Sequence, residues 1–400
     1  MSDAKTKSAR QPNPVSDKLG YVDAMRGIAI LMVIVVHQVP VSGMSPLILH
    51  LSEYGQMGVQ LFFVASAYTL CISHVRRAGE PAPLASFYIR RYFRIAPLYY
   101  LAIPLYGFLQ FARYYFTVHY APADLNLQAI DQSGNYSLSN IVANLTFIHG
   151  FVPAANNAVV PGGWSIGTEM AFYLIFPALF HVLTRQGSIS RVLGIWAGVF
   201  IANVCVNAAL QNIFDIPIGK NTFVYCNLLN QLPVFIGGAF AFFWIFSKNA
   251  AITPLSIARD IFLFFTFTAI SFALWDSNYD LAFSIIPTTS GCSFIFLINI
   301  IRAIPLDLTA LRKVGQVSFS MYIFHFLFAE TMAKLAIKLL GNVSHPNLVY
   351  VAMLTATIFC TYAIATISKH LIEDPGIDFG KKMISRVRRH ITHRAEQAAT

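Results

Sequence analysis

Charged residues are scarce in this chain of 400 residues, because Asp, Glu, Lys and Arg together supply only 12% of it. A soluble globular domain carries about 25% charged residues. Since 56% of the chain is hydrophobic, it has too little polar surface to cover a fold that faces water. The composition therefore excludes an ordinary soluble domain and favours a protein whose solvent is the lipid bilayer.

Cysteine is also sparse, and its spacing indicates no special chemistry. The five cysteines are scattered, mostly within apolar runs, and no two have the Cys-x-x-Cys spacing of a metal site. We interpret them as small buried hydrophobic residues. The sequence predicts neither a disulfide framework nor a metal centre.

The N-terminal segment lacks the apolar stretch of a cleavable signal peptide. Residues 1–20 are polar and contain Pro12, Pro14 and several lysines. We expect this segment to be a disordered cytoplasmic tail, followed by a membrane domain over 21–375. Residues 376–400 are rich in Lys and Arg, and we expect a basic cytoplasmic tail that lies against anionic lipid head groups.

Long apolar runs predict an all-α integral membrane protein. About 20 apolar residues are needed for a helix to cross a bilayer, and Val192–Leu210 and Leu281–Ile301 are two runs of about this length. We predict about ten transmembrane helices, over residues 24–41, 54–74, 95–117, 164–183, 191–211, 226–247, 257–276, 281–302, 316–340 and 348–372.

The distribution of Lys and Arg predicts the orientation. Cytoplasmic flanks of membrane proteins carry an excess of these residues. With the N-terminus inside, 24 of the 28 Lys and Arg residues face the cytoplasm, and the other four are Arg113, Lys220, Lys334 and Lys338. Both termini are therefore predicted to be cytoplasmic, and the longest loop, 118–163, extracytoplasmic. The net charge of +10 is spread over the inner flanks, so we expect no nucleic-acid partner.

Ionisable residues inside the spans are the candidates for function, because they are costly to bury in a membrane. Arg26 and His37 are eleven residues apart on the first span. A rotation of about 1100° places them on one helix face, and the rise between them is about 16 Å. A neutral imidazole at His37 suits a general base. The alternative is that His37 is only a packing or interfacial histidine.

Three arginines mark the inner end of the third span. Arg90, Arg91 and Arg94 fall within five residues, and guanidinium groups suit phosphate oxygens. They are candidates for binding a phosphorylated donor from the cytosol. The alternative is ordinary anchoring of the span by positive charge at the inner face.

A carboxylate opens the fourth span from the outside. Glu169 lies about one and a half turns into this helix and needs a partner there. His37, at a similar depth, is a candidate, because a carboxylate can hold an imidazole in one tautomer. The alternative is a structural pair with an arginine.

The last two spans carry weaker signals. His325 falls in the ninth span and could line the same cavity, although alone it is more often structural. At the inner end of the tenth span, we expect Pro375 to stop the helix. We interpret Glu373 beside it as structural.

Six motifs occur in order over residues 20–380, and together they resemble acyltransferase family 3. They are Arg26-x10-His37, Phe62-Phe63-Val64-x-Ser66, Arg91-x-x-Arg94, Trp164-Ser165-x3-Glu169-x2-Phe172-Tyr173, Ser318-Phe319-x-x-Tyr322-x-x-His325 and Glu373-x-Pro375. Two positions depart from the family pattern. Ala67 stands where Gly is common, and Thr168 stands where a second acidic residue is common.

The resemblance implies transfer of an acyl group, usually acetyl from acetyl-CoA, to a hydroxyl of an extracytoplasmic polysaccharide such as O-antigen or exopolysaccharide. It implies a multi-pass protein of the cell (inner) membrane, similar to the members without an SGNH hydrolase-like domain. Neither the acceptor sugar nor an oligomeric state can be read from the sequence.

The expected mechanism assigns a role to each candidate. The phosphates of CoA bind Arg26, Arg90, Arg91 and Arg94, and His37, oriented by Glu169, takes a proton or carries the acetyl group. Trp164, Tyr322 and His325 are expected to bind the substrate. The competing hypothesis is a transporter or flippase for a glycan intermediate, in which the Arg, His and Glu residues form a proton relay.

Overall fold

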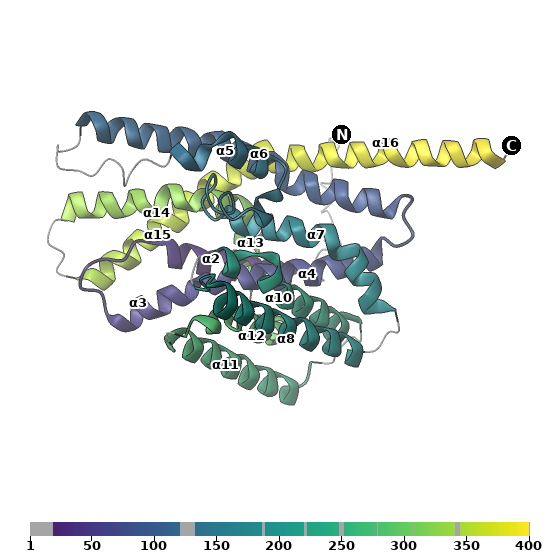
Figure 1. Ribbon diagram of the computed structural model, residues 1–400, viewed down its shortest axis with the longest axis horizontal. Helices are drawn as coiled ribbons and strands as arrows, with labels where there is room; N and C mark the ends of the chain where they lie inside the picture. The colour runs from purple at the N-terminus through teal and green to yellow at the C-terminus, as the bar shows by residue number, and fades with distance from the viewer. Residues whose placement is uncertain are drawn as a thin grey trace, which may run out of the picture.

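The computed structural model confirms the all-α class. It describes residues 19–120, 133–185, 189–219, 222–247, 252–277, 279–305, 307–340 and 345–399. All secondary-structure elements within these ranges are helices, and most of them run roughly along the long axis of the molecule (Figure 1). Residues 1–18, most of the predicted N-terminal tail, lie outside the described residues.

Long helices form the body of the fold. They are α2 (Gly20–His37), α4 (Gly58–Arg76), α5 (Pro83–Tyr120), α7 (Gly163–Thr184), α8 (Ile189–Phe214), α10 (Leu228–Ala241), α11 (Pro254–Asp276), α12 (Ile286–Ala303), α14 (Ser318–Leu340), α15 (Pro346–Ser368) and α16 (Asp374–Ala399). Shorter helices connect them: α3 (Pro46–Glu53), η1 (Tyr54–Met57), η3 (Ser133–Tyr136), α6 (Leu138–Leu145), η4 (Ile148–Phe151), α9 (Phe223–Cys226), η5 (Phe242–Ser247), η6 (Asp280–Ser284), α13 (Thr309–Gln316) and η7 (Lys369–Glu373).

Each of the ten predicted spans overlaps one or more of these helices. By length and composition, nine helical segments of the described ranges can cross a membrane. The segment predicted at 316–340 is α14, which is not among the nine. Glu330 and Lys334 lie in its second half and lower its mean hydropathy.

Helix α2 packs against α13 and α4 through glycines. A Cβ atom at Gly315 of α13 would lie 1.8 Å from the carbonyl oxygen of Asp23, and one at Gly27 would lie 2.3 Å from that of Leu311. Because no side chain fits between them, the backbones of α2 and α13 are in direct contact. This contact fixes the depth of α2, which carries Arg26 and His37.

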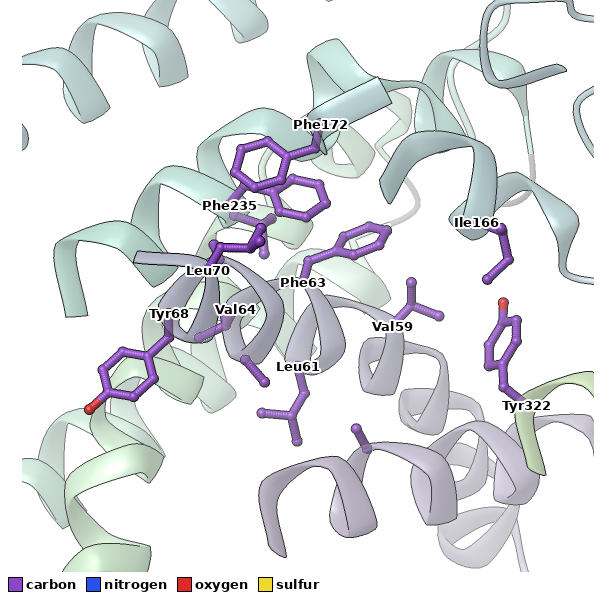
Figure 2. Packing of buried hydrophobic residues seen from close by; sticks show 14 of the residues in the cluster. Val59, Leu61, Phe63, Val64, Tyr68, Leu70, Ile166, Phe172, Phe235 and Tyr322 are labelled. Atoms are coloured by element: carbon purple, nitrogen blue, oxygen red, sulfur yellow. The ribbon is translucent and has the colours of Figure 1, made fainter. Parts of the chain in front are cut away.

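Aromatic stacking joins α4, α7 and α10. The ring centroids of Phe63 and Phe235 are 4.4 Å apart, and those of Phe172 and Phe235 are 4.0 Å apart. Figure 2 shows these three rings together above the buried aliphatic residues of α4. Offset stacking adds to the energy of apolar packing, so this cluster fixes α7 against α4.

The segment predicted as the outer loop 118–163 is folded where it is described. Within it, α6 and η4 are held against α5 and α7 by buried polar groups. The hydroxyl of Tyr99 donates to Asn144 at 2.6 Å, and Nε2 of His149 donates to the carbonyl of Gly163 at 3.0 Å. Residues 133–163 therefore form a lid fixed to the start of α7.

The prediction that Pro375 stops the last span is wrong. The chain continues from α15 through the π-helical turn η7 into α16, which lies against α5 and extends beyond the other labelled helices (Figure 1). Proline lacks a backbone donor, and a π-helical turn directly before it accommodates the altered hydrogen bonding. The predicted basic tail 376–400 is therefore helical over its described part.

Glu373, which we interpret as structural, contacts a serine of another helix. It is 5% exposed and accepts a hydrogen bond from the hydroxyl of Ser320. This contact joins η7 to α14.

We expect Gly315→Ala to destabilise the protein by about 1–3 kcal/mol, because the added methyl group forces α13 away from α2. Gly198→Ala on α8 is the matched control, since a Cβ atom there meets nothing within 4 Å. Thermal unfolding in detergent measures both. Equal melting temperatures for Gly315→Ala and the wild type would contradict the direct backbone contact.

Candidate active site

The first of two neighbouring pockets is lined by arginines. It holds about 670 Å³ of empty space, open solvent included. We call it the arginine pocket, and its polar residues include Arg26, Ser66, Arg91, Arg94, Ser165, Glu169, Tyr173, Ser318 and Tyr322. Its wall is formed by five long helices, α2, α4, α5, α7 and α14.

Contacts with neighbouring side chains hold the guanidinium groups in place. Arg26 lies 3.4 Å from the carboxylate of Asp23 and donates to the hydroxyl of Thr69 at 3.1 Å. The guanidinium of Arg91 lies over the ring of Tyr173, 5.5 Å from its centroid. A cation over an aromatic face is stabilised without losing its charge, so Arg91 remains able to bind an anion.

Arg90, predicted to bind the donor, does not line the arginine pocket. It donates to Oε2 of Glu80 at 2.9 Å, and Arg388 of α16 lies 2.5 Å from the same oxygen. Because consecutive residues of a helix point about 100° apart, Arg90 and Arg91 face different surroundings. Arg90 therefore helps to join α5 to α16.

Glu169 lies in the arginine pocket and does not orient His37. Its Oε1 accepts a hydrogen bond from Ser66 at 2.6 Å and another from the hydroxyl of Tyr173. The sequence-based pairing of Glu169 with His37 is wrong because the two side chains line different pockets.

Ser66 and Tyr173 belong to motifs named in the sequence analysis, but neither was assigned a role in the site. Tyr173 lies four residues after Glu169, so the two share one helix face. This spacing in the sequence already predicts that the two side chains can meet. Ser66 comes from another helix, and only the tertiary structure brings its hydroxyl to Glu169.

The second pocket is larger and contains His37. It encloses about 2440 Å³, open solvent included, and we call it the histidine pocket. Its polar and aromatic residues include His37, Gln56, Tyr106, Gln110, Arg113, Asn135, Tyr136, Asn157, Trp164, Tyr225, Tyr322, Glu330 and Lys334. The predicted residue Trp164 therefore lies on its wall.

His325 lies behind His37 and not on the wall of the histidine pocket. It is completely buried, and its Nε2 is 3.2 Å from Nδ1 of His37. The ring of Phe326 packs on both imidazoles, with centroid distances of 4.5 and 4.0 Å. The expectation that His325 binds the substrate is therefore corrected, because its nearest functional group is His37.

Tyr322 and Val59 line both pockets and separate them. The hydroxyl of Tyr322 accepts a hydrogen bond from Ser165 at 2.7 Å and donates one to the carbonyl of Gly162 at 2.9 Å. Gly162 has φ = +71°, and a Cβ atom there would lie 2.9 Å from this hydroxyl. A glycine is required both by the backbone conformation and by the close approach of Tyr322.

The two pockets lie toward opposite ends of the same helices. On α5 the arginine pocket takes residues 91–95 and the histidine pocket takes residues 106–117. On α14 the corresponding residues are 318–322 and 322–334, and on α2 they are Arg26 and 33–37. The two pockets therefore follow one another along the bundle axis and meet at Tyr322.

Residues 19–366 match an acyltransferase domain. The chain belongs to acyltransferase family 3. This match covers every residue of the two pockets named above. Five of the six motifs that carried the resemblance lie within it, and Glu373-x-Pro375 lies beyond its end.

Two curated relatives are similar to this member of acyltransferase family 3. The peptidoglycan O-acetyltransferase OatA of Listeria monocytogenes is 23% identical over 373 residues, which cover 88% of this chain and 55% of OatA. The acyltransferase MdmB of Streptomyces mycarofaciens is 26% identical over 163 residues, which cover 40% of this chain and 37% of MdmB. The matched part of the chain thus spans 55% of the length of OatA and 37% of the length of MdmB. No solved structure matches it.

The two pockets should be reached from opposite sides of the membrane. In a cysteine-free background, we expect a membrane-impermeant maleimide to label Asn157→Cys in intact cells and Arg94→Cys only in inverted vesicles. Asn157 lines the histidine pocket and Arg94 the arginine pocket. Labelling of both positions from one side would contradict the predicted orientation.

Proposed function

We propose that this protein transfers an acetyl group from cytosolic acetyl-CoA to a hydroxyl of an extracytoplasmic polysaccharide. It would do so in the cell (inner) membrane, with both termini cytoplasmic. The observation that carries the proposal is the pair of pockets, one rich in arginine and one containing histidine, that meet at Tyr322. Membership of acyltransferase family 3 and the name of the O-acetyltransferase relative support the reaction type.

The charge of the arginine pocket suits the donor. Three guanidinium groups and one carboxylate line it, which leaves it positive. Guanidinium groups bind phosphate oxygens through paired hydrogen bonds. We assign Arg26, Arg91 and Arg94 to the phosphates of CoA. Glu169, held by Ser66 and Tyr173, balances part of this charge and keeps Tyr173 in position beneath Arg91.

The position of His37 suits the chemical step. Eleven residues of α2 separate it from Arg26, a rise of about 16 Å. A pantetheine arm that starts at the arginines has a comparable reach, so its thioester can come to the partition at Tyr322. The donor therefore presents its reactive carbon where the two pockets meet.

The histidine pocket suits a glycan acceptor. Its wall combines aromatic rings, such as Trp164 and Tyr106, with amide side chains, such as Gln56 and Asn157. Aromatic faces cover the apolar faces of sugars, and amides exchange hydrogen bonds with sugar hydroxyls. The pocket is also open to solvent, so a long glycan chain can extend out of it.

The proposed reaction conserves atoms and charge. His37 takes the proton of an acceptor hydroxyl as the oxygen attacks the thioester carbonyl carbon. The new C–O bond forms, the C–S bond breaks, and the leaving thiolate takes the proton back from His37. The products are the acetyl ester and free CoA thiol.

Arg91 and Arg90 provide a matched pair for the donor site. We expect Arg91→Gln to raise the KM for acetyl-CoA by about 10- to 100-fold, since each charge-assisted hydrogen bond contributes about 1.5–3 kcal/mol. Arg90→Gln removes the same charge one residue away and should leave this KM within about threefold, because Arg90 contacts Glu80. Equal effects of the two substitutions would return both arginines to a general anchoring role.

His37 tests the proposal as a whole. With acetyl-CoA and a panel of cell-surface glycans, wild-type protein should release free thiol only when a suitable glycan is present. We expect His37→Ala to lower this release by at least about 100-fold, which is the lower end of the range for general-base catalysis. Donor binding should not change. Folded wild-type protein that releases no thiol with any glycan would favour the transporter or flippase hypothesis.

A further inference from the structure

Two histidines from different helices face each other beside the partition. Nδ1 of His37 on α2 lies 3.2 Å from Nε2 of His325 on α14. His325 is completely buried, and an unpaired polar group in such a place is costly. The question is which of the four ring nitrogens carry protons.

The backbone carbonyls settle the tautomer of His325. Its Nδ1 lies 2.8 Å from the carbonyl oxygen of Tyr322. A carbonyl only accepts hydrogen bonds, so this nitrogen is the donor and carries the ring proton. In the neutral ring, Nε2 of His325 then has a lone pair, which points at His37.

The same reasoning assigns the proton on His37. Its Nδ1 lies 2.8 Å from the carbonyl oxygen of Val33 and 3.2 Å from the lone pair of His325. Two acceptors face this nitrogen, so it must be the donor. In neutral His37 the lone pair is therefore on Nε2.

We infer that His325 is the positioning residue of His37: by accepting a hydrogen bond from Nδ1–H of His37 across the helix interface, it helps to keep the lone pair of His37 on Nε2. This inference rests on the proposed function, in which Nε2 takes the proton of the acceptor hydroxyl. When Nε2 becomes protonated, the Nδ1 donor keeps both of its acceptors. The proton transfer therefore does not require either of these hydrogen bonds to break.

The arrangement also allows the pair only one additional proton. If His325 were charged, its Nε2 would become a donor and would oppose the Nδ1 donor of His37 at 3.2 Å. The additional proton therefore belongs on Nε2 of His37. The rings of Phe326 and Tyr322 pack against His325 and keep its surroundings apolar.

Two substitutions of His325 separate positioning from packing. His325→Phe keeps a planar ring but removes the acceptor, and we expect kcat to fall by between about 10-fold and 10⁴-fold, the range for partners that orient a working imidazole. His325→Gln can place an amide oxygen near the position of Nε2, and kcat should stay within about tenfold of wild type. The KM for acetyl-CoA should not change in either variant.

The tautomer itself is measurable without turnover. In ¹⁵N-histidine-labelled wild-type protein, the His37 signals, assigned by comparison with His37→Gln, should show a protonated Nδ1 and an unprotonated Nε2. In His325→Phe, only the Val33 carbonyl remains as an acceptor for Nδ1, and the fraction of His37 protonated on Nε2 should rise above that of the wild type. Thermal unfolding of both variants identifies a loss of activity that is caused by misfolding.

Three results would overturn the inference: a wild-type proton on Nε2 of His37, full kcat in His325→Phe, or an equal loss in His325→Gln and His325→Phe in folded protein. Failure of the proposed function looks different. In that case His37→Ala keeps its activity, or no thiol is released, while the wild-type spectrum still shows the Nδ1 tautomer.

Discussion

The hydroxyl of Tyr322 makes the contact on which the site depends. It accepts from Ser165 and donates to the carbonyl of Gly162, and thus joins α14 to the start of α7. In a bilayer such a polar group must be satisfied within the protein, and two hydrogen bonds achieve this. The same residue lies between the arginine and histidine pockets and lines both of them.

The partition is supported on both sides by rigid packing. On one side, the direct contact of the α2 and α13 backbones at Gly27 and Gly315 fixes the depth of Arg26 and His37. On the other, the lid over residues 133–163 is fixed to α7 through His149 and Gly163. Hydrogen bonds between buried polar groups are specific because any other arrangement leaves a donor or acceptor unpaired. The distance between the proposed donor and acceptor sites is therefore built into the fold.

The permanent charges of the arginine pocket and the histidines of the other pocket occupy separate regions. Arginines gather in one pocket, where Asp23, Glu169 and the ring of Tyr173 accompany them. In the other pocket, His37 is exposed at the end of α2 and His325 is completely buried beside it, and neither ring needs to be charged. A neutral imidazole exchanges protons near neutral pH. This separation agrees with a phosphate-bearing donor at one end and proton transfer near the partition.

The sequence by itself determined what depends on local pattern. Hydropathy located the long apolar helices, helical periodicity predicted one face for Arg26 and His37, and the motifs contain most residues of the arginine pocket but few of the histidine pocket. Only the tertiary structure decided the partners: Glu169 with Ser66, His37 with His325, Arg91 rather than Arg90 in the pocket, and a helix that continues past Pro375. The physical reason is that periodicity and apolar length act along one helix. Pairing depends on the relative depth and rotation of several helices, which their packing sets together.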